Sequence, residues 1–392
     1  MRCLLVKLAG AVGCLHAQQM LRGGAAAALI SGQPAGLRLA AGCWTGVRRR
    51  LAVPSPPSPG SEPGGLRHKA RNARDGARVN GIFKFNRLGV MRLFPCDRFR
   101  LPLPDGHSFP IDKYSLLRQR LERHAAAGAP LEFIEPHAAT DDELLRVHCR
   151  DYVGRVMAGM LTRDEIRRIG FPWSPQLVER SLRSTGAAVD AAAAALEDGV
   201  AASLAGGTHH AGTNWGEGYC VFNDVAVAAR EMQDRGAVRR VLVLDCDVHQ
   251  GNGTAEIFAA DETVFTMSIH GARNFPLRKQ PGSLDVPLED GTGDDEYLER
   301  LERAIAESFA RAASDLVLYI AGADPYEGDR LGRLRLTKQG LLARDRLVLD
   351  AARRAGVPTA IVCGGGYCTD LESIVDIHAA TMLLAAGVDL PA

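Results

Sequence analysis

The sequence predicts an α/β fold, a three-layer sandwich in which a central, mostly parallel sheet is flanked by helices. Three observations lead to this prediction. From about residue 200 onward, short apolar runs alternate with longer segments of helical character. The run at residues 241–244, VLVL, is apolar throughout, which is typical of a strand buried on both faces of a parallel sheet. The runs end in polar or glycine-containing segments, which indicate loops.

The predicted elements follow in chain order and show no internal repeat or second domain. Strands are expected over residues 200–204, 241–244, 263–269, 315–320 and 358–363. Helices are expected over residues 114–124, from 141 to about 148–152, and over 178–196, 223–235, 296–312, 341–355 and 371–386. Asp112 is the expected N-cap of the first helix, and Gly199 follows the end of the alanine-rich third helix.

Composition and charge narrow the classes of function. The chain has 392 residues, 46% of them hydrophobic, which is enough for a large core. Residues 91–392 carry 33 Lys and Arg against 44 Asp and Glu, which argues against direct nucleic-acid binding and is compatible with a cationic substrate. The nine cysteines form no CxxC pair, which indicates reduced thiols in an intracellular protein. No apolar run approaches the roughly 20 residues of a membrane span.

Residues 1–90 are expected to be a basic extension without a packed core. They are rich in Ala, Gly, Pro and Arg and hold 14 Lys and Arg against 2 Asp and Glu. A transit peptide, a disordered tail, and an upstream stretch wrongly joined to a protein that starts near Met91 all fit this composition. The predicted location is the cytoplasm, or a mitochondrion or plastid if residues 1–80 are a transit peptide.

Unusual polar residues follow four of the predicted strands. In open parallel α/β sheets the carboxyl ends of the strands lie at one edge, and sites form beyond that edge. We therefore expect these side chains to converge, although each pattern alone is a weak signal. They are His209 and His210, the triplet Asp245, Asp247 and His249, then Asp324, and Gly366 followed by Tyr367.

These residue types suit metal-assisted amide hydrolysis. Asp247, His249 and Asp324 offer two oxygens and one nitrogen, a set that suits catalytic zinc with a fourth position left for water. A metal at that point polarises a carbonyl group and lowers the pKa of bound water toward about 7.

Proton transfer would fall to the adjacent histidines. One of His209 and His210 can take a proton from water while the other serves the leaving amine. Asp245 and Asn252 are the available partners to orient the two rings. Tyr367, on its glycine-rich turn, can donate its hydroxyl to the oxyanion. This set predicts hydrolysis without a covalent enzyme intermediate.

On these motifs, the chain from about residue 94 to residue 384 resembles the histone deacetylase family of the arginase/deacetylase fold, in its bacterial and class IV-like branch. Several motifs in one order are a stronger signal than any single pattern. The matching motifs are residues 206–211 (GGTHHA), 218–224 (GYCVFND), 245–253 (DCDVHQGNG), 321–324 (AGAD) and 364–367 (GGGY). The resemblance implies a deacetylase-like catalytic domain within residues 91–392.

The resemblance also implies roles for the matching residues. The implied zinc ligands are Asp247, His249 and Asp324, with ferrous iron as an alternative metal. The implied catalytic set is His210 as general base, His209 as electrostatic or acid partner oriented by Asp245, Tyr367 as carbonyl polariser, and Asn252. A structural potassium ion is implied at Asp245, Asp247, His249, Ser268 and Ile269. The implied acyl-lysine tunnel is formed by Gly218, Tyr219, Phe275, Gly365 and Gly366.

Three positions depart from the family's class I pattern. Tyr219 stands where Phe is usual, which alters the polarity of the tunnel. Asn252 replaces an Asp, and the pair His249-Gln250 replaces His-His. Both of these changes are seen in class IV-like members. A neutral Asn should raise the basicity of His210 less than an Asp would, which bears on the pH optimum.

The leading hypothesis is a zinc-dependent hydrolase that removes acetyl or longer acyl groups from the side-chain amine of lysine in proteins. Acetylated polyamines or another small acylated amine are alternative substrates. A two-metal ureohydrolase similar to arginase is disfavoured, because Gln250 and Gly251 stand where a second metal needs an acid. A module that binds acyl-lysine without hydrolysing it should lack a ligand or Tyr367, and neither is missing. No membrane partner is expected, and no oligomeric state is predicted.

Overall fold

A sheet of eight parallel strands forms the centre of the fold in the computed structural model, which describes residues 89–390. Neighbouring strands run in the order β2-β1-β3-β8-β7-β4-β5-β6. The predicted α/β sandwich is confirmed, with a sheet that is parallel at every pairing. The predicted extension over residues 1–90 lies outside the described residues except for its last two positions.

Strands and helices alternate along most of the chain. The strands are β1 (Met91–Phe94), β2 (Leu131–Phe133), β3 (Val200–Ser203), β4 (Val241–Asp245), β5 (Val264–Gly271), β6 (Leu284–Leu288), β7 (Leu316–Gly322) and β8 (Thr359–Gly364). The helices are α1 (Lys113–Ala126), α2 (Asp141–Leu145), α3 (Arg150–Met157), α4 (Arg163–Ile169), α5 (Pro175–Asp198), α6 (Asp224–Asp234), α7 (Asn252–Ile257), α8 (Asp294–Ala312), α9 (Lys338–Ala355) and α10 (Leu371–Ala385).

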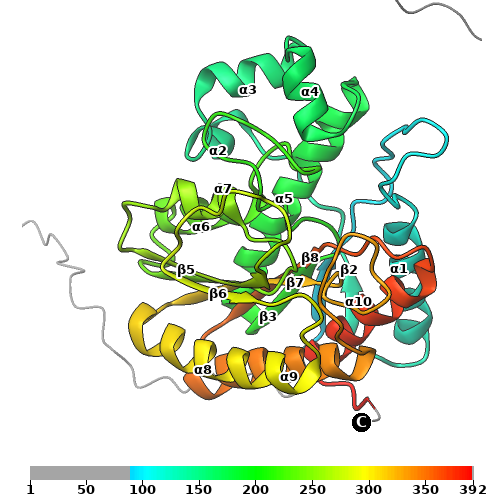
Figure 1. Cartoon of the computed structure of the whole chain (residues 1–392), viewed down its shortest axis with the longest axis vertical. Coiled ribbons are helices and arrows are strands. Elements are labelled where there is room, and N and C mark those ends of the chain that lie inside the picture. The colour runs from blue at the N-terminus through cyan, green and yellow to red at the C-terminus, as the bar shows by residue number, and fades with distance from the viewer. Residues whose placement is uncertain (1–88, 391–392) are drawn as a thin grey trace, which may run out of the picture. The chain divides into compact units, whose positions relative to one another are not determined.

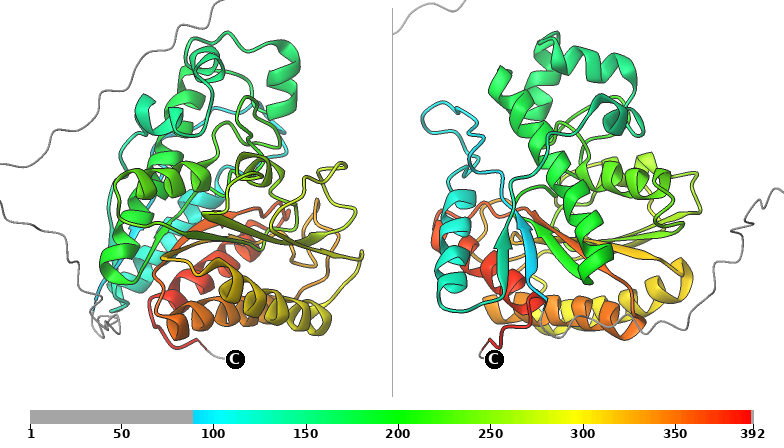
Figure 2. Two further views of the ribbon diagram at one scale, coloured as in Figure 1. Left: turned by 90° about the vertical axis from the view of Figure 1, so that its left-hand side faces the viewer. Right: turned by 180° about the vertical axis from the view of Figure 1, so that it is seen from behind.

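Helices cover both faces of the sheet (Figures 1 and 2). α1, α8, α9 and α10 lie on one face, and α5 and α6 cover the other. Alternate residues of β4 point to opposite faces, so Val241 and Val243 enter the core under α5 while Leu242 and Leu244 enter the core under α9. Full burial of each such side chain contributes about 1.5–3 kcal/mol. This two-sided burial explains why the strand is apolar throughout.

Local signals fix the ends of the longest helix. The hydroxyl of Ser174 accepts a hydrogen bond from the backbone N–H of Leu177 (3.1 Å), and Pro175 occupies the first turn. Gly199 ends α5 with φ +90°, where an L side chain would be strained, as predicted from its position. α5 then leads directly into β3, which carries the loop of the predicted histidine pair.

One sequence prediction holds only in part, and another was wrong. Asp112 is the N-cap residue of α1 as predicted, but its side chain makes no capping hydrogen bond and instead lies 3.3 Å from Arg100. The helix expected from residue 141 is two helices, α2 and α3. The helix is interrupted between α2 and α3 because the His148 ring is held by the carbonyl of Gly212 and the N–H of Asn223. The backbone of Cys149 is extended there.

Among residues 89–390, no helix combines the length and the apolar character that a membrane crossing requires.

Candidate active site

The ends of two neighbouring strands bring two carboxylates and an imidazole together in a buried group. Asp247 and His249 follow β4, and Asp324 follows β7, which pairs with β4. Nδ1 of His249 lies 2.9 Å from Oδ1 of Asp247 and 3.1 Å from Oδ2 of Asp324. One donor atom from each residue lies within 4.8 Å of the others, so the group can hold a metal ion.

The charges of this group favour a cation. Burial raises the pKa of Asp324 to about 7, and the nearby Asp247 carboxylate adds repulsion. Burial opposes the charged ring of His249, but the two carboxylates outweigh it and raise the pKa of His249 to about 10. Two carboxylates buried this close together are costly without a compensating positive charge. Their oxygens and the imidazole nitrogen form a donor set that fits a transition metal.

The loop after β8 approaches the same group closely. Gly365 has φ +46°, and a Cβ atom there would lie 2.1 Å from the carboxylate of Asp324. Glycine is therefore required for this close approach.

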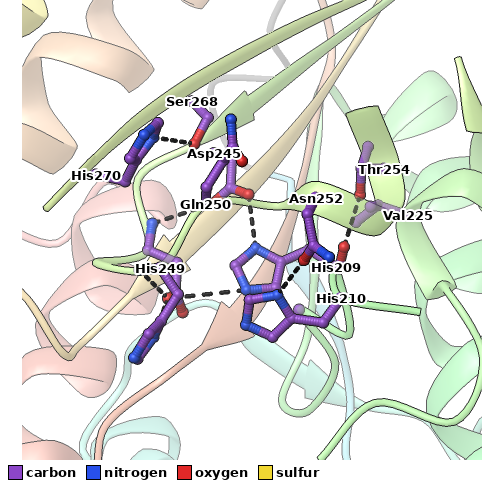
Figure 3. Close-up of polar contacts among 12 residues, drawn as sticks. His209, His210, Val225, Asp245, His249, Gln250, Asn252, Thr254, Ser268 and His270 are labelled. Carbon is purple, nitrogen blue, oxygen red and sulfur yellow. Dashed lines mark hydrogen bonds and ion pairs between the residues drawn. The ribbon is translucent and has the colours of Figure 1, made fainter. Parts of the chain in front are cut away.

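Each histidine of the pair has its own partner (Figure 3). Nδ1 of His209 donates to Oδ2 of Asp245 (2.6 Å), and Nδ1 of His210 donates to Oδ1 of Asn252 (2.7 Å). The two ring centroids are 4.2 Å apart. Both rings are buried beside the Asp-His-Asp group, and Nε2 of His209 lies 3.8 Å from Oδ1 of Asp247.

The two histidines differ in their tendency to carry a proton. Burial opposes a charge on His209, but Asp245 and Asp247 outweigh it and raise its pKa to about 9. Burial lowers the pKa of His210 well below its ordinary value, and the neighbouring His209 and His249 rings lower it further. One ring therefore favours the charged form and the other the neutral form, as acid–base chemistry by a pair requires.

Asp224, the first residue of α6, holds the loop that carries the pair. Its buried carboxylate accepts the backbone N–H groups of Gly207 and Thr208, both at 2.9 Å. In return, the Thr208 hydroxyl accepts the N–H of Asp224 (3.1 Å). These reciprocal bonds fix the loop against a helix end, which limits the movement of the two histidines that follow.

Tyr367 reaches the site from the loop after β8, and its ring centroid lies 6.2 Å from that of His249. Asp329 accepts the backbone N–H of Tyr367 (2.6 Å), while Nε of Arg330 donates to its carbonyl (2.7 Å). Burial raises the pKa of the Tyr367 hydroxyl well above its ordinary value, and Asp247 and Asp324 add to the shift. The hydroxyl therefore remains a proton donor at neutral pH.

Most of the predicted tunnel residues line a cavity that reaches His249 of the Asp-His-Asp group. The outer cavity has a volume of about 580 Å³ and is lined by Gly218, Tyr219, Phe275, His210, His249 and Tyr367, among others. Gly365 lines a smaller inner cavity of about 40 Å³ together with Asp247. Gly366, also predicted as a tunnel residue, lines neither cavity, and its backbone carbonyl accepts a hydrogen bond from Lys113 (3.1 Å).

The predicted potassium residues lie on adjacent strands. Asp245 of β4 pairs in register with Ser268 of β5, and Ile269 follows it. The Ser268 hydroxyl is 2.9 Å from Nδ1 of His270 (Figure 3). Both carboxylate oxygens of Asp245 already accept hydrogen bonds, from His209 and from the N–H of Asp247.

Three residues at the site were not singled out from the sequence. Glu217 accepts a hydrogen bond from the Asn252 amide (2.6 Å), and Asp329 holds the Tyr367 loop. Lys113 of α1 is fully buried and donates to the carbonyls of Gly365 and Gly366. A buried lysine is rare, but only the fold reveals that it is buried.

Comparison with known sequences identifies one protein family. The sequence model described as histone deacetylase domain matches residues 107–382. An uncharacterized protein of Picosynechococcus sp. is 44% identical over 277 residues, which cover 71% of this chain and 92% of that protein. The histone deacetylase-like amidohydrolase of Pseudomonas aeruginosa is 33% identical over 284 residues, which cover 68% of this chain and 74% of that protein.

Solved structures show the same fold. The crystal structure of a histone deacetylase homologue from Aquifex aeolicus superposes with a TM-score of 0.67 at 24% sequence identity. The alignment covers 77% of this chain and 85% of the other. At this identity the likeness supports the fold alone.

Proposed function

The chain belongs to the histone deacetylase family, and on that premise we propose that it hydrolyses the amide that joins an acetyl or longer acyl group to a lysine side chain in proteins. One observation carries the proposal. The Asp-His-Asp group, the histidine pair and Tyr367 converge beside one cavity that opens outward. That the chain belongs to the class IV-like branch of this family remains a prediction.

We assign the metal site to Asp247, His249 and Asp324. The two carboxylates and one imidazole fit zinc, with ferrous iron as the second candidate. When bound, the ion would polarise the substrate carbonyl and lower the pKa of water. The compensation that the two buried carboxylates require supports the assignment.

The protein residues then divide the proton transfers. His210, neutral and fixed by Asn252, would accept a proton from the attacking water. His209, paired with Asp245, would stabilise the negative charge that develops and serve the departing amine. The Tyr367 hydroxyl would donate a hydrogen bond to the oxyanion. We also propose a structural potassium ion near Asp245, Ser268 and Ile269, on the ground that Asp245 of β4 pairs with Ser268 of β5.

Two substrate classes are supported by different observations. The broad outer cavity and the exposed Leu277 and Leu331 at its rim suit a polypeptide that carries an acyl-lysine. A small acylated amine such as an acetylpolyamine is the second candidate, because the chain after residue 90 is acidic. We place the polypeptide first because a small amine would leave the apolar rim without a partner.

Turnover by the full-length chain loaded with zinc tests the proposal. The substrates are peptides with acetyl- to myristoyl-lysine, acetylated polyamines, and arginine. We expect Asp324→Ala to lose at least about 10³-fold in kcat/KM, since the metal chemistry is worth several kcal/mol. Asp295→Ala, which removes an exposed carboxylate from the first turn of α8, is the matched control.

The outcomes separate the candidate functions. Preference for a peptide or a polyamine decides the substrate class. Turnover of arginine with two metals per chain would support a ureohydrolase. Binding of acyl-lysine peptides without turnover, at one metal per chain, would overturn the hydrolase proposal and support a binding module.

A further inference from the structure

The side chain of Asn252 lies between His210 and Glu217. Its Oδ1 accepts the hydrogen bond from Nδ1 of His210 (2.7 Å), and its Nδ2 donates to Oε1 of Glu217 (2.6 Å). Among residues 89–390, the Asn252 side chain has no other hydrogen-bond partner. The three groups form a chain that runs from the outer cavity, where Glu217 lies, to the imidazole.

The chemistry of Glu217 decides which way the amide points. An ionised carboxylate only accepts hydrogen bonds, so the NH₂ group of Asn252 must face it. The amide oxygen then faces His210, and only a protonated Nδ1 can donate to it. His210 is thereby held in the tautomer that leaves the lone pair on Nε2 free to accept a proton.

The reversed amide would undo this arrangement. Its oxygen would face the carboxylate of Glu217, two acceptors in contact, and its NH₂ group would face Nδ1 of His210. The imidazole would then carry its proton on Nε2 and lose its function as a base. An aspartate at position 252 would present an oxygen to His210 in either orientation, but an asparagine requires a partner that selects one.

The backbone around Glu217 is fixed in place. The N–H of Cys220 donates to the carbonyl of Glu217 (3.0 Å), and the N–H of Gly218 donates to the carbonyl of Arg168 at the end of α4 (3.1 Å). Gly216 is packed so tightly that a Cβ atom would lie 2.5 Å from the Tyr152 hydroxyl. Glu217 is therefore presented to Asn252 by a rigid turn.

We propose that Glu217 is a positioning residue that orients the Asn252 amide and, through it, sets the tautomer of His210. This inference rests on the proposed function, because it matters for catalysis only if His210 is the base. Glu217 itself touches neither the reacting atoms nor the metal ligands in this scheme.

A double-mutant cycle on the zinc-loaded full-length chain tests the inference. General base catalysis contributes about 10²–10⁴-fold, so partial loss of the correct tautomer in Glu217→Ala should lower kcat about tenfold. Glu217→Gln keeps the size of the side chain, but its amide can donate as well as accept and so pairs with either orientation of Asn252; kcat should therefore fall by a similar factor. Asp164→Ala removes an exposed carboxylate that pairs with Arg167, a residue that lines the outer cavity, and serves as the control.

The Asn252→Asp background gives the sharpest contrast. A carboxylate at position 252 has no orientation to select and repels Glu217. Glu217→Ala should therefore leave kcat unchanged or raise it in that background, although it lowers kcat in the unmodified chain. A residue that only supported the fold would lower kcat in both backgrounds.

The ¹⁵N chemical shifts of His210 provide a readout besides activity. We expect the Nδ1-protonated tautomer in the unmodified chain, and a mixture of tautomers in Glu217→Ala and in Glu217→Gln. No loss of kcat in either variant, full activity of Glu217→Gln, or an unchanged tautomer in Glu217→Ala would each overturn the inference. If the unmodified chain turns over no substrate, the proposed function fails instead, and the tautomer measurement still decides the role of Glu217.

Discussion

At the scale of single residues, the backbone of Tyr367 is held on both sides by consecutive residues. Asp329 binds its N–H, and Arg330 binds its carbonyl while also donating to the carbonyl of Ser108 (2.9 Å). This clamp fixes the loop that brings the Tyr367 ring beside His249 of the Asp-His-Asp group. Preorganised donors of this kind stabilise developing charge effectively, because they need no reorganisation during the reaction.

Tyr367→Phe should therefore reduce turnover without disturbing binding. Loss of one oxyanion donor typically costs about 10²–10³-fold in kcat, and we expect that range here with KM and metal content little changed. Tyr297→Phe removes a buried hydroxyl that makes no hydrogen bond to a nitrogen or oxygen atom among the described residues, and it should leave kcat unchanged. Steady-state kinetics on an acyl-lysine peptide provide the comparison. Equal activity of Tyr367→Phe and the unmodified chain would argue against the assigned role.

Leu277 offers a test of substrate class at the same scale. This side chain is 92% exposed at the rim of the outer cavity, so its replacement should not affect stability. If the substrate is a polypeptide, Leu277→Ser should raise KM about fivefold by removing roughly 1 kcal/mol of apolar contact. KM for an acetylated polyamine should not change. Val90→Ser, next to the start of β1 at the opposite edge of the sheet, is the matched control.

The sequence identified residues whose chemistry is unusual at a strand end, but it could not identify their supports. His209, His210 and Asp324 stand out because a buried polar side chain after an apolar strand needs an explanation. Glu217 and Asp329 look like ordinary loop acids in the sequence. Their roles depend on contacts with residues 35 and 38 positions away in the chain.

At the scale of elements, helix α9 stabilises the ends of β4 and β7, the strands that the Asp-His-Asp group follows. Arg344 is fully buried, and its Nη2 lies 2.8 Å from Oδ1 of Asp345. Its Nη1 donates to the carbonyl of Gly322 at the end of β7 and lies 3.5 Å from that of Cys246 after β4. Asp345 also accepts hydrogen bonds from the hydroxyl of Tyr319 on β7 (2.5 Å) and from the hydroxyl of Thr381 on α10 (2.6 Å).

Arg344→Met should strongly destabilise the fold. Removing one partner of a buried ion pair costs about 3–5 kcal/mol, since the remaining charge is left uncompensated. The double variant with Asp345→Leu should recover part of that loss. Arg354→Met, an exposed position on the same helix, should change the free energy of unfolding by less than about 0.5 kcal/mol. Urea denaturation measures all three, and a small effect of Arg344→Met would show that the pair is dispensable.

His137 links the loop before α2 to α5 in a pH-dependent way. Its ring lies 2.9 Å from Asp190 and 3.1 Å from Glu143. The hydrogen bond to Asp190 raises the pKa of His137, although burial opposes the shift. The raised pKa means that the charged ring stabilises the folded state below about pH 6.5, the ordinary value. This contribution disappears as the pH rises through the folded-state pKa.

His137→Gln should therefore lower the melting temperature more at pH 5.5 than at pH 9. Because the ring is about one-third exposed, solvent screening limits the effect to about 0.5–1 kcal/mol. His124→Gln, at a histidine with no carboxylate contact among the described residues, should show a smaller pH dependence. A deficit for His137→Gln that grew with pH would contradict the assignment of the ion pairs.

The sequence predicted the inner strands of the sheet better than its edges. β4, β7 and β8 are continuous apolar runs because helices cover both faces. β6 contains Pro287 and β2 has only three residues, and each lies at an edge where fewer apolar residues are needed. β1 escaped prediction because Arg92 interrupts its four residues; this side chain lies 2.6 Å from Asp198 at the end of α5.

At the scale of the whole molecule, parallel topology explains why the site could be predicted in advance. Every strand ends at the same edge, so residues as distant in the chain as His209 and Tyr367 meet there. The order of the strands was not predictable, yet the convergence did not depend on it. β3, β8, β7 and β4 are consecutive in the sheet, which brings their loops together.

The two apolar cores also set the smallest chain that should fold. Among residues 89–390, the members of both cores lie between Met91 and Leu390, on the two faces of one sheet. The N–H of Met91 donates to the carbonyl of Pro130 (2.8 Å), and the Met91 side chain is buried. A chain that starts at Gly89 keeps this peptide N–H, whereas a chain that starts at Met91 replaces it with a charged ammonium group at the first bond of the strand.

We expect the chain shortened to residues 89–392 to match the full-length chain within about 0.5 kcal/mol in its free energy of unfolding, since it keeps every core contact found among residues 89–390. The chain that starts at Met91 should be less stable by about 1–3 kcal/mol, because its ammonium group, although it can still donate to the carbonyl of Pro130, loses part of its hydration beside a buried side chain. Urea denaturation and zinc content measure both. If the chain from Gly89 fails to fold or to bind one zinc ion, residues 1–88 must contribute contacts to the domain. If both shortened chains match the full-length chain, the first bond of β1 contributes little, and the sheet depends on its inner strands.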